Sequence, residues 1–232
     1  MTLIIYSHSS YKDVLEICLE QLKKFGNSYK TYTFLDKDIG FENTILYNES
    51  FSYPERVYSC LQQVQEKAIL FQHEDMILYS SPDYNKLKKY FSFVEKDKVD
   101  SIKLIKGGGI EQDLSVTNDL HSILPSHPNM FAVQPTIWNK EKLEKVLKAH
   151  FGLTIWQMET NANKFLIDNK YRMLYSYVRE QDKKRGLYHY DSSVYPYIAT
   201  AICKGKWNLK EYPELQQVLK DYKIDWKARG QF

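Results

Sequence analysis

The first hundred residues alternate between short apolar runs and amphipathic stretches. The runs Leu3–Tyr6 and Ala68–Phe71 are continuously apolar, which is typical of strands that are covered on both faces in a parallel sheet. Two further runs, Tyr32–Leu35 and Thr44–Tyr47, have the length and composition of strands. The pattern therefore predicts four strands in this part of the chain.

Three stretches have the 3.6-residue period of amphipathic helices. The first covers Lys12–Phe25, where the apolar side chains fall on one face. The second is predicted to begin after an N-cap at Ser52, to carry Pro54 in its first turn and to run to Val64. The third lies around Tyr84–Val94.

Beyond the third helix, the segments Ile102–Ile105 and Phe131–Gln134 are predicted as strands. The glycine run Gly107–Gly109 lacks the spacing of a dinucleotide or phosphate loop, and we expect a flexible loop there. The order of elements predicts an α/β fold with a mainly parallel central sheet flanked by helices. Ligands of such sheets bind outside the carboxyl ends of the strands, so polar residues at those ends are the first candidates for function.

Composition and charge narrow the class of protein. The chain has 232 residues, of which 43% are hydrophobic and 15% aromatic, and this excludes a disordered chain. It contains no repeat and no linker-like stretch, which predicts a single Rossmann-like domain over residues 1–232. Thirty-two basic and 29 acidic residues leave only a weak positive excess, so we do not expect nucleic acid as a partner.

The sequence shows no targeting or membrane-spanning segment. No apolar run approaches the roughly 18 residues that a transmembrane helix needs, and the first strand is followed at once by polar residues. The three cysteines, Cys18, Cys60 and Cys203, lie far apart among apolar neighbours and are predicted to be reduced. These features predict a soluble, cytoplasmic protein.

The sequence Gln72-His73-Glu74-Asp75-Met76 is the clearest candidate site, because it stands where a buried strand runs out. Side chains alternate along a strand, so His73 and Asp75 are expected on one side and Glu74 on the other. An imidazole and a carboxylate at this spacing could hold Mn²⁺ or Mg²⁺ against a diphosphate. The alternative is a polar strand end that simply meets water.

Several segments together resemble small GT-A-type glycosyltransferases. The segments that carry the resemblance follow one another along nearly the whole chain: Ile69–Met76, Phe131–Trp138, Ile155–Glu159, Tyr195–Tyr197 and Lys204–Trp207. The chain looks most like the enzymes of bacterial surface-polysaccharide clusters and those with which large DNA viruses glycosylate their capsids. If the source is viral, the expected compartment is the host cytoplasm.

The resemblance implies a nucleotide-binding half at 1–110 and an acceptor-side half at 111–232. It also implies a UDP- or GDP-linked sugar donor and a divalent cation, Mn²⁺ or Mg²⁺, held by an Asp-x-Asp motif. This chain has His73-Glu74-Asp75 at that place, so Asp75 is the expected ligand, while His73 is either a ligand or a contact to ribose or phosphate. An acidic pair also occurs at Asp36-Lys37-Asp38, which is predicted as a loop or a contact to the nucleoside.

The resemblance also implies a catalytic acid on the acceptor side. Inverting transfer needs a carboxylate that removes the proton of the acceptor hydroxyl. Glu159 follows Trp156 near the start of a predicted helix and is the expected base, with Asp191 in reserve. The alternative is that Glu159 only complements the helix dipole. His189 is expected to return to the metal or diphosphate, unless its role is structural.

Further contacts to the donor are predicted at the ends of the first two strands, near the second helix and on a late segment. The residues are Ser7, His8, Ser9, Asp36, Glu74, Arg56, Lys204, Lys206 and Arg229. Solvated surface charges are the alternative interpretation of the basic ones.

Aromatic residues near the predicted base suggest a subsite for a glycan acceptor, because the apolar faces of pyranose rings pack on aromatic planes. Trp156 is the preferred candidate, Trp138 is expected in the core, and four late tyrosines are the remaining candidates: Tyr188, Tyr190, Tyr195 and Tyr197. The predicted function is glycosyl transfer from a nucleotide sugar to a glycan. The alternatives are a catalytically silent nucleotide- or glycan-binding module on the same fold and a sugar nucleotidyltransferase.

Overall fold

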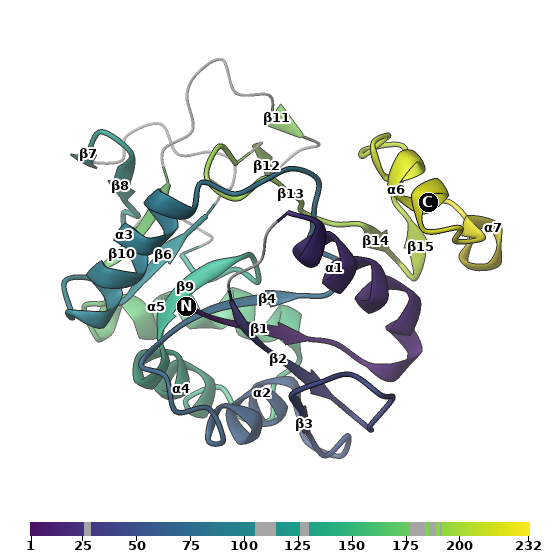
Figure 1. Cartoon of the computed structure of the whole chain (residues 1–232). Helices are drawn as coiled ribbons and strands as arrows, with labels where there is room; N and C mark the ends of the chain where they lie inside the picture. The colour runs from purple at the N-terminus through teal and green to yellow at the C-terminus, as the bar shows by residue number, and fades with distance from the viewer. Residues whose placement is uncertain (26–28, 105–114, 126–129, 177–183, 186–188, 191) are drawn as a thin grey trace.

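The computed structural model describes residues 1–25, 29–104, 115–125, 130–176, 184–185, 189–190 and 192–232 (Figure 1). The predictions for Gly107–Gly109, Tyr188 and Asp191 lie outside these residues. His189 and Tyr190 are described only by their backbone.

A nine-stranded sheet forms the centre of the protein. Its order is β3-β2-β1-β4-β9-β6-β10-β8-β7. The strands are β1 (Thr2–Tyr6), β2 (Lys30–Leu35), β3 (Thr44–Leu46), β4 (Ala68–His73), β6 (Ser101–Lys103), β7 (Ser115–Thr117), β8 (Leu120–Ser122), β9 (Thr136–Asn139) and β10 (Met173–Ser176). Strands β8 and β9 run opposite to all the others, so the carboxyl ends of β1, β2, β4 and β6 lie at one edge. The predicted α/β class with a mainly parallel sheet is confirmed.

Helices flank the sheet on both sides. They are η1 (Ser9–Tyr11), α1 (Lys12–Lys24), α2 (Tyr53–Leu61), α3 (Tyr84–Glu95), α4 (Lys140–Lys148), α5 (Ile155–Asp168), α6 (Leu215–Asp221) and α7 (Trp226–Arg229). The three predicted helices are present, and α2 begins with the predicted cap, in which Ser52 and Glu55 form a reciprocal capping box. It ends at Leu61, three residues earlier than predicted, because the chain turns there.

Three short strand pairs complete the fold. They are β5 (Ile77–Leu78) with β13 (Tyr197–Ile198), β11 (Lys184–Arg185) with β12 (His189–Tyr190), and β14 (Ile202–Cys203) with β15 (Lys206–Trp207).

The core has two layers, one on each face of the sheet. Side chains of α1, α3 and the C-terminal region pack on one face, and side chains of α2, α4 and α5 pack on the other. Alternate residues of β1 divide between them, since Leu3 and Ile5 belong to the first layer and Ile4 and Tyr6 to the second. This burial on both faces accounts for the continuously apolar strands.

The predicted strand Phe131–Gln134 is wrong, because β9 begins only at Thr136. The backbone N–H groups of Phe131 and Val133 donate to the side chains of Asn163 and Glu159, at 3.1 and 2.6 Å. These N–H groups are therefore not available to a neighbouring strand, and Pro135 has no N–H to offer. Helix α5 thus fixes this segment as a loop.

Candidate functional site

Polar side chains collect at the carboxyl ends of β1, β4 and β6, as predicted for a sheet of this kind. Tyr6 is in register with His73, so the two strands end side by side. The chain then turns through Glu74 and Asp75 into β5. The predicted metal-binding sequence is therefore placed at the edge where a ligand of this fold would bind.

His73 lies on the sheet face that α2 and α5 cover. Its ring is 5.1 Å from that of Tyr6 and 5.7 Å from that of Tyr53, and its Nε2 is 2.9 Å from the Tyr53 hydroxyl. Burial lowers the pKa of His73 to about 3. His73 is therefore neutral at physiological pH, so one ring nitrogen can accept a hydrogen bond or bind a metal ion.

Glu74 and Asp75 both lie toward α1 and the C-terminal region, away from the face of His73. The expectation that His73 and Asp75 lie on one side is therefore wrong, because the chain leaves the strand at His73 and turns, so the alternation of a strand no longer holds. Burial raises the pKa of both carboxyl groups, and the charge of Asp75 raises that of Glu74 further. Hydrogen bonds from Ser7 to Glu74 and from the Ile202 backbone to Asp75 act in the opposite direction. A buried and an adjacent half-buried acid thus repel each other, and such perturbed acids are a marker of functional sites.

Glu159 projects from the second turn of α5 toward the same edge. Its Oε1 accepts the Val133 N–H, and Oε2 is left for another partner. The charges of both Glu159 and Glu74 raise the pKa of Tyr53, after the larger effect of its burial. Tyr53 therefore lies within electrostatic range of the predicted base and of the acidic turn, which places the two in one neighbourhood.

Lys103 is a member of this neighbourhood that sequence reasoning missed. It ends β6 and is only 3% exposed. Thr136 of β9 pairs with Lys103 on one side and with Phe71 on the other, so all three share the sheet face of His73. Burial lowers the pKa of Lys103 to about 7, and the charge of Glu159 partly offsets this effect. The available signal was a lysine inside the otherwise apolar segment Ile102–Ile105, which was predicted as a strand.

A second polar group lies at the ends of β1 and β2. The backbone N–H and the hydroxyl of Ser9 donate to Asp36 at 2.6 and 2.7 Å. Although burial opposes its ionisation, these bonds hold the pKa of Asp36 below its usual value. His8 accepts the Ser10 N–H at Nδ1, which leaves Nε2 as the donor to Glu49 at 2.8 Å. The structure thus brings together the predicted nucleoside contacts Ser9, Asp36 and His8.

Glu49 was not predicted, because it lies in the loop before α2 and has no motif around it. One ligand atom each from His8, Asp36 and Glu49 lies within 4.8 Å of the others, so this group could hold a cation. Each atom already has a hydrogen-bonding partner, however. The three side chains therefore hold one another and Ser9 in place in this structure.

The predicted basic contacts are placed outside the acidic turn. The Nε of Arg56 donates to the Phe51 carbonyl at 2.7 Å. Lys204 and Lys206 are exposed, on the hairpin of β14 and β15. Arg229 pairs with Asp13 in α1 and borders a surface hollow of about 680 Å³. Its charge nevertheless lowers the pKa of Glu74, so Arg229 is the basic residue for which the structure shows an effect on the acidic turn.

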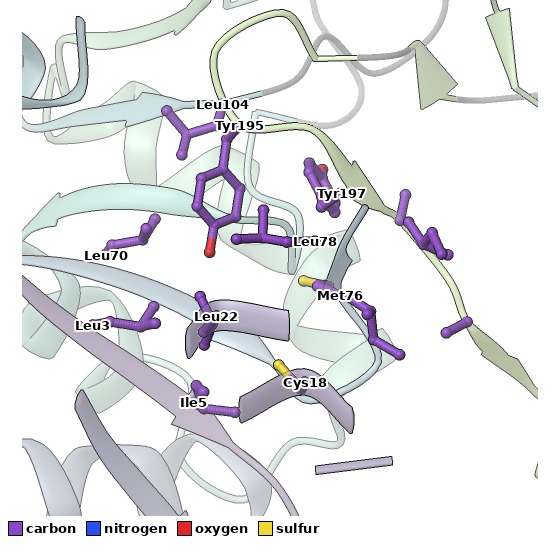
Figure 2. Close-up of a cluster of buried hydrophobic side chains, with 14 of the residues drawn as sticks. Leu3, Ile5, Cys18, Leu22, Leu70, Met76, Leu78, Leu104, Tyr195 and Tyr197 are labelled. Carbon is purple, nitrogen blue, oxygen red and sulfur yellow. The ribbon is translucent and has the colours of Figure 1, made fainter. Parts of the chain in front are cut away.

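The aromatic residues predicted to bind the acceptor differ in their exposure to solvent. Tyr195 and Tyr197 are 0% and 2% exposed and lie among Leu78, Met76 and other apolar side chains of the first core layer (Figure 2). Their proposed place in an acceptor wall is therefore wrong. Trp138 is 3% exposed, as expected of a core residue, and Trp156 is 76% exposed at the start of α5.

Comparison with known proteins shows the fold. No family model and no curated protein matches the sequence. Among solved structures, the chain resembles residues 1–349 of S. aureus TarS at 11% identity, with a TM-score of 0.51 over 97% of this chain and 66% of that one. Bifunctional IspDF from Campylobacter jejuni matches at 12% identity and a TM-score of 0.46, over 79% of this chain and 51% of that one. The CMP:2-keto-3-deoxy-manno-octonic acid synthetase complexed with CTP matches at 9% identity with a TM-score of 0.49, over 75% of this chain and 88% of that one. The chain therefore shares the fold of residues 1–349 of TarS, of which it covers about two thirds, whereas it covers 40% of the longer TarS structure and about half of IspDF.

Within the described part of the chain, every helix is too short or too polar to cross a membrane.

Proposed function

We propose that the protein is a glycosyltransferase of GT-A type, which moves a sugar from a nucleotide-sugar donor to a glycan acceptor with inversion. The observation that carries this proposal is the convergence of His73, the Glu74–Asp75 turn, Glu159 and Lys103 at the carboxyl edge of the sheet. Two adjacent acids whose pKa values are raised by burial have a large energetic cost in a structural role alone. The shared fold with TarS, which has been solved in complex with UDP, supports the proposal.

The acidic turn fits a divalent cation. Glu74 is buried, Asp75 is half-buried, and the two acids repel each other, so a cation would relieve this repulsion. Carboxylate oxygens suit Mn²⁺ and Mg²⁺, and an imidazole nitrogen is compatible with Mn²⁺. Asp75 would hold the ion together with Glu74, whereas His73, on the other side of the sheet, would contact ribose or phosphate. When bound, the ion supplies positive charge that stabilises the departing diphosphate.

Glu159 would act as the base. Its bond to the Val133 N–H fixes the side chain, so the second carboxylate oxygen can take the proton of the acceptor hydroxyl as the hydroxyl oxygen attacks C1 of the sugar. At the other end of the site, Ser9, Asp36 and His8 would contact the nucleoside.

The products of slow donor breakdown test the reaction class. Incubation of wild type with UDP- and GDP-linked sugars in Mn²⁺, followed by chromatography, should yield nucleoside diphosphate and free sugar. Release of nucleoside monophosphate, by cleavage between the α and β phosphates, would instead indicate a sugar nucleotidyltransferase. Binding without any turnover in the presence of glycan acceptors would indicate the silent binding module.

Asp75→Asn should weaken the binding of UDP or GDP in Mn²⁺ by about 10- to 100-fold, because a ligand of the ion is lost. Binding in EDTA should change little. Titration calorimetry measures both. Asp168→Asn is the matched control, since it makes the same change at an exposed acid in the last turn of α5. Equal affinities of Asp75→Asn and wild type in Mn²⁺ would contradict the assignment.

Trp156→Ala should raise the acceptor KM or abolish transfer, while donor hydrolysis and the Tm stay close to wild type, because the side chain is 76% exposed. Steady-state kinetics with glycan acceptors and a melting curve check this. Trp138→Ala, in contrast, should lower the free energy of unfolding by about 3–5 kcal/mol, because it opens a cavity in the core. An unchanged acceptor KM in Trp156→Ala would place the acceptor elsewhere.

A further inference from the structure

A second hollow lies between α4 and α5, apart from the candidate site. Its volume is about 400 Å³, which is in the range of pockets for small ligands. Lysines from α4 form one wall, and Phe165, Asn169 and Tyr171 form the other. No acidic side chain is among the lining residues.

The lysine wall carries charge that the described residues do not neutralise. Lys142, Lys145 and Lys148 follow one another at three-residue spacing, which puts them on neighbouring positions of the α4 surface, where like charges repel. Lys142 pairs with Asp100 at 3.3 Å. The ion pairs among the described residues include neither Lys145 nor Lys148. The helix dipole favours basic residues in the last turn of α4, but it does not account for an acid-free hollow beside them.

The opposite wall is aromatic and fixed in place. The Tyr171 hydroxyl donates to the Lys142 carbonyl at 3.0 Å, and the Tyr171 ring lies 6.0 Å from that of Phe165. Tyr171 is 9% exposed. An anion in the hollow would lie against this wall and close to the exposed ammonium groups of Lys145 and Lys148, whose positive charge would attract it.

We infer that the hollow between α4 and α5 binds a phosphate group that is part of a small phosphoester. Lysine ammonium groups bind phosphate as point charges, and the organic part of the ester would cover Phe165 and Tyr171. A soluble phosphoester and a phospholipid headgroup share this chemistry. None of the lining residues takes part in the proposed transfer reaction, so phosphate binding here does not depend on the proposed function.

Two probes distinguish a soluble phosphoester from a phospholipid headgroup. Glycerol 3-phosphate is titrated into ¹⁵N-labelled wild type, and amide shifts are expected around Lys145, Lys148 and Asn169. In parallel, sedimentation is measured with vesicles of phosphatidylcholine and phosphatidylglycerol at 4:1. Binding of glycerol 3-phosphate alone identifies a soluble phosphoester, and binding of the vesicles indicates a headgroup. Absence of binding to both would overturn the inference.

Variants locate the binding. K145Q/K148Q should reduce the affinity for the bound probe at least tenfold, and K145R/K148R should retain it. K23Q/K24Q is the matched control, because it removes the same charge from the last turn of α1, where acidic groups lie within 4 Å of both lysines. Melting curves check that each variant is folded. Unchanged affinity in K145Q/K148Q, or an equal loss in K23Q/K24Q, would show that the hollow is not the site.

Discussion

Glu159→Gln should lower the rate of sugar transfer by about a hundredfold or more, with donor affinity close to that of wild type. Glutamine keeps the size of the side chain and can still accept the Val133 N–H that Glu159 binds at 2.6 Å. It cannot accept a proton from the acceptor hydroxyl, and the loss therefore falls on the chemical step. Release of nucleoside diphosphate from the donor, with calorimetry for donor affinity, measures the two quantities.

Asn163→Ala is the control that shows whether Glu159→Gln lowers the rate of transfer only by disturbing the loop 130–135. Asn163 accepts the Phe131 N–H from the same helix, so this variant disturbs the loop without removing the base. A similar loss of rate in Asn163→Ala would assign Glu159 to holding the loop. If Glu159→Gln is active and Asp191→Asn is inactive, Asp191 is the base.

Lys103→Met should stabilise the protein near neutral pH and impair transfer. Burial lowers the pKa of Lys103 from its ordinary value of 10.5 to about 7, so between these values the unfolded chain binds a proton that the folded chain does not. Wild-type stability therefore rises with pH through this window. Methionine removes the titration, and its advantage should be largest at or below pH 7, by up to about 5 kcal/mol, and should shrink toward pH 10.

Urea unfolding of wild type and variant at pH 6.5, 8 and 9.5 checks this trend. Ser101→Ala is the control, because Ser101 is buried at the other end of β6 and carries no charge. Its effect on the free energy of unfolding should not depend on pH. If the difference in the free energy of unfolding between Lys103→Met and wild type does not depend on pH, the pKa of Lys103 is not lowered in the folded protein. An unchanged rate of sugar transfer in Lys103→Met would show that Lys103 is not part of the catalytic site.

The sheet and its flanking helices were largely predictable, because local patterns determine them. Continuous apolar runs marked β1 and β4, and the Ser52 cap marked the start of α2. The segment Phe131–Gln134 had the composition of a strand, but its N–H groups bond to α5 side chains some thirty residues later in the chain. No local pattern reveals such a partner.

The site was predictable only in part, for the same reason. The ends of β1 and β4 could be located from their strands, which identified Ser9 and the acidic turn. Lys103 was missed because a lysine normally marks an exposed position, and its burial depends on the helices that cover this face of the sheet (Figure 1). Tyr195 was misplaced because an amphipathic side chain looks alike in a core and in a sugar-binding wall; here its hydroxyl donates to Gln72 at 2.8 Å inside the core.

The central claim is that the carboxyl edge of the sheet binds a nucleotide sugar together with a divalent cation. A thermal-shift screen of UDP- and GDP-linked sugars, each with Mn²⁺ and with EDTA, tests it most directly. At a hundred times its Kd, a ligand adds about 2.7 kcal/mol to the stability of the folded state, which corresponds to a rise in Tm of about 5–10 °C for a chain of this size. We expect such a rise for at least one donor in Mn²⁺, with a smaller rise in EDTA and in Asp75→Asn. An unchanged Tm with every nucleotide sugar, with and without metal, would contradict the account.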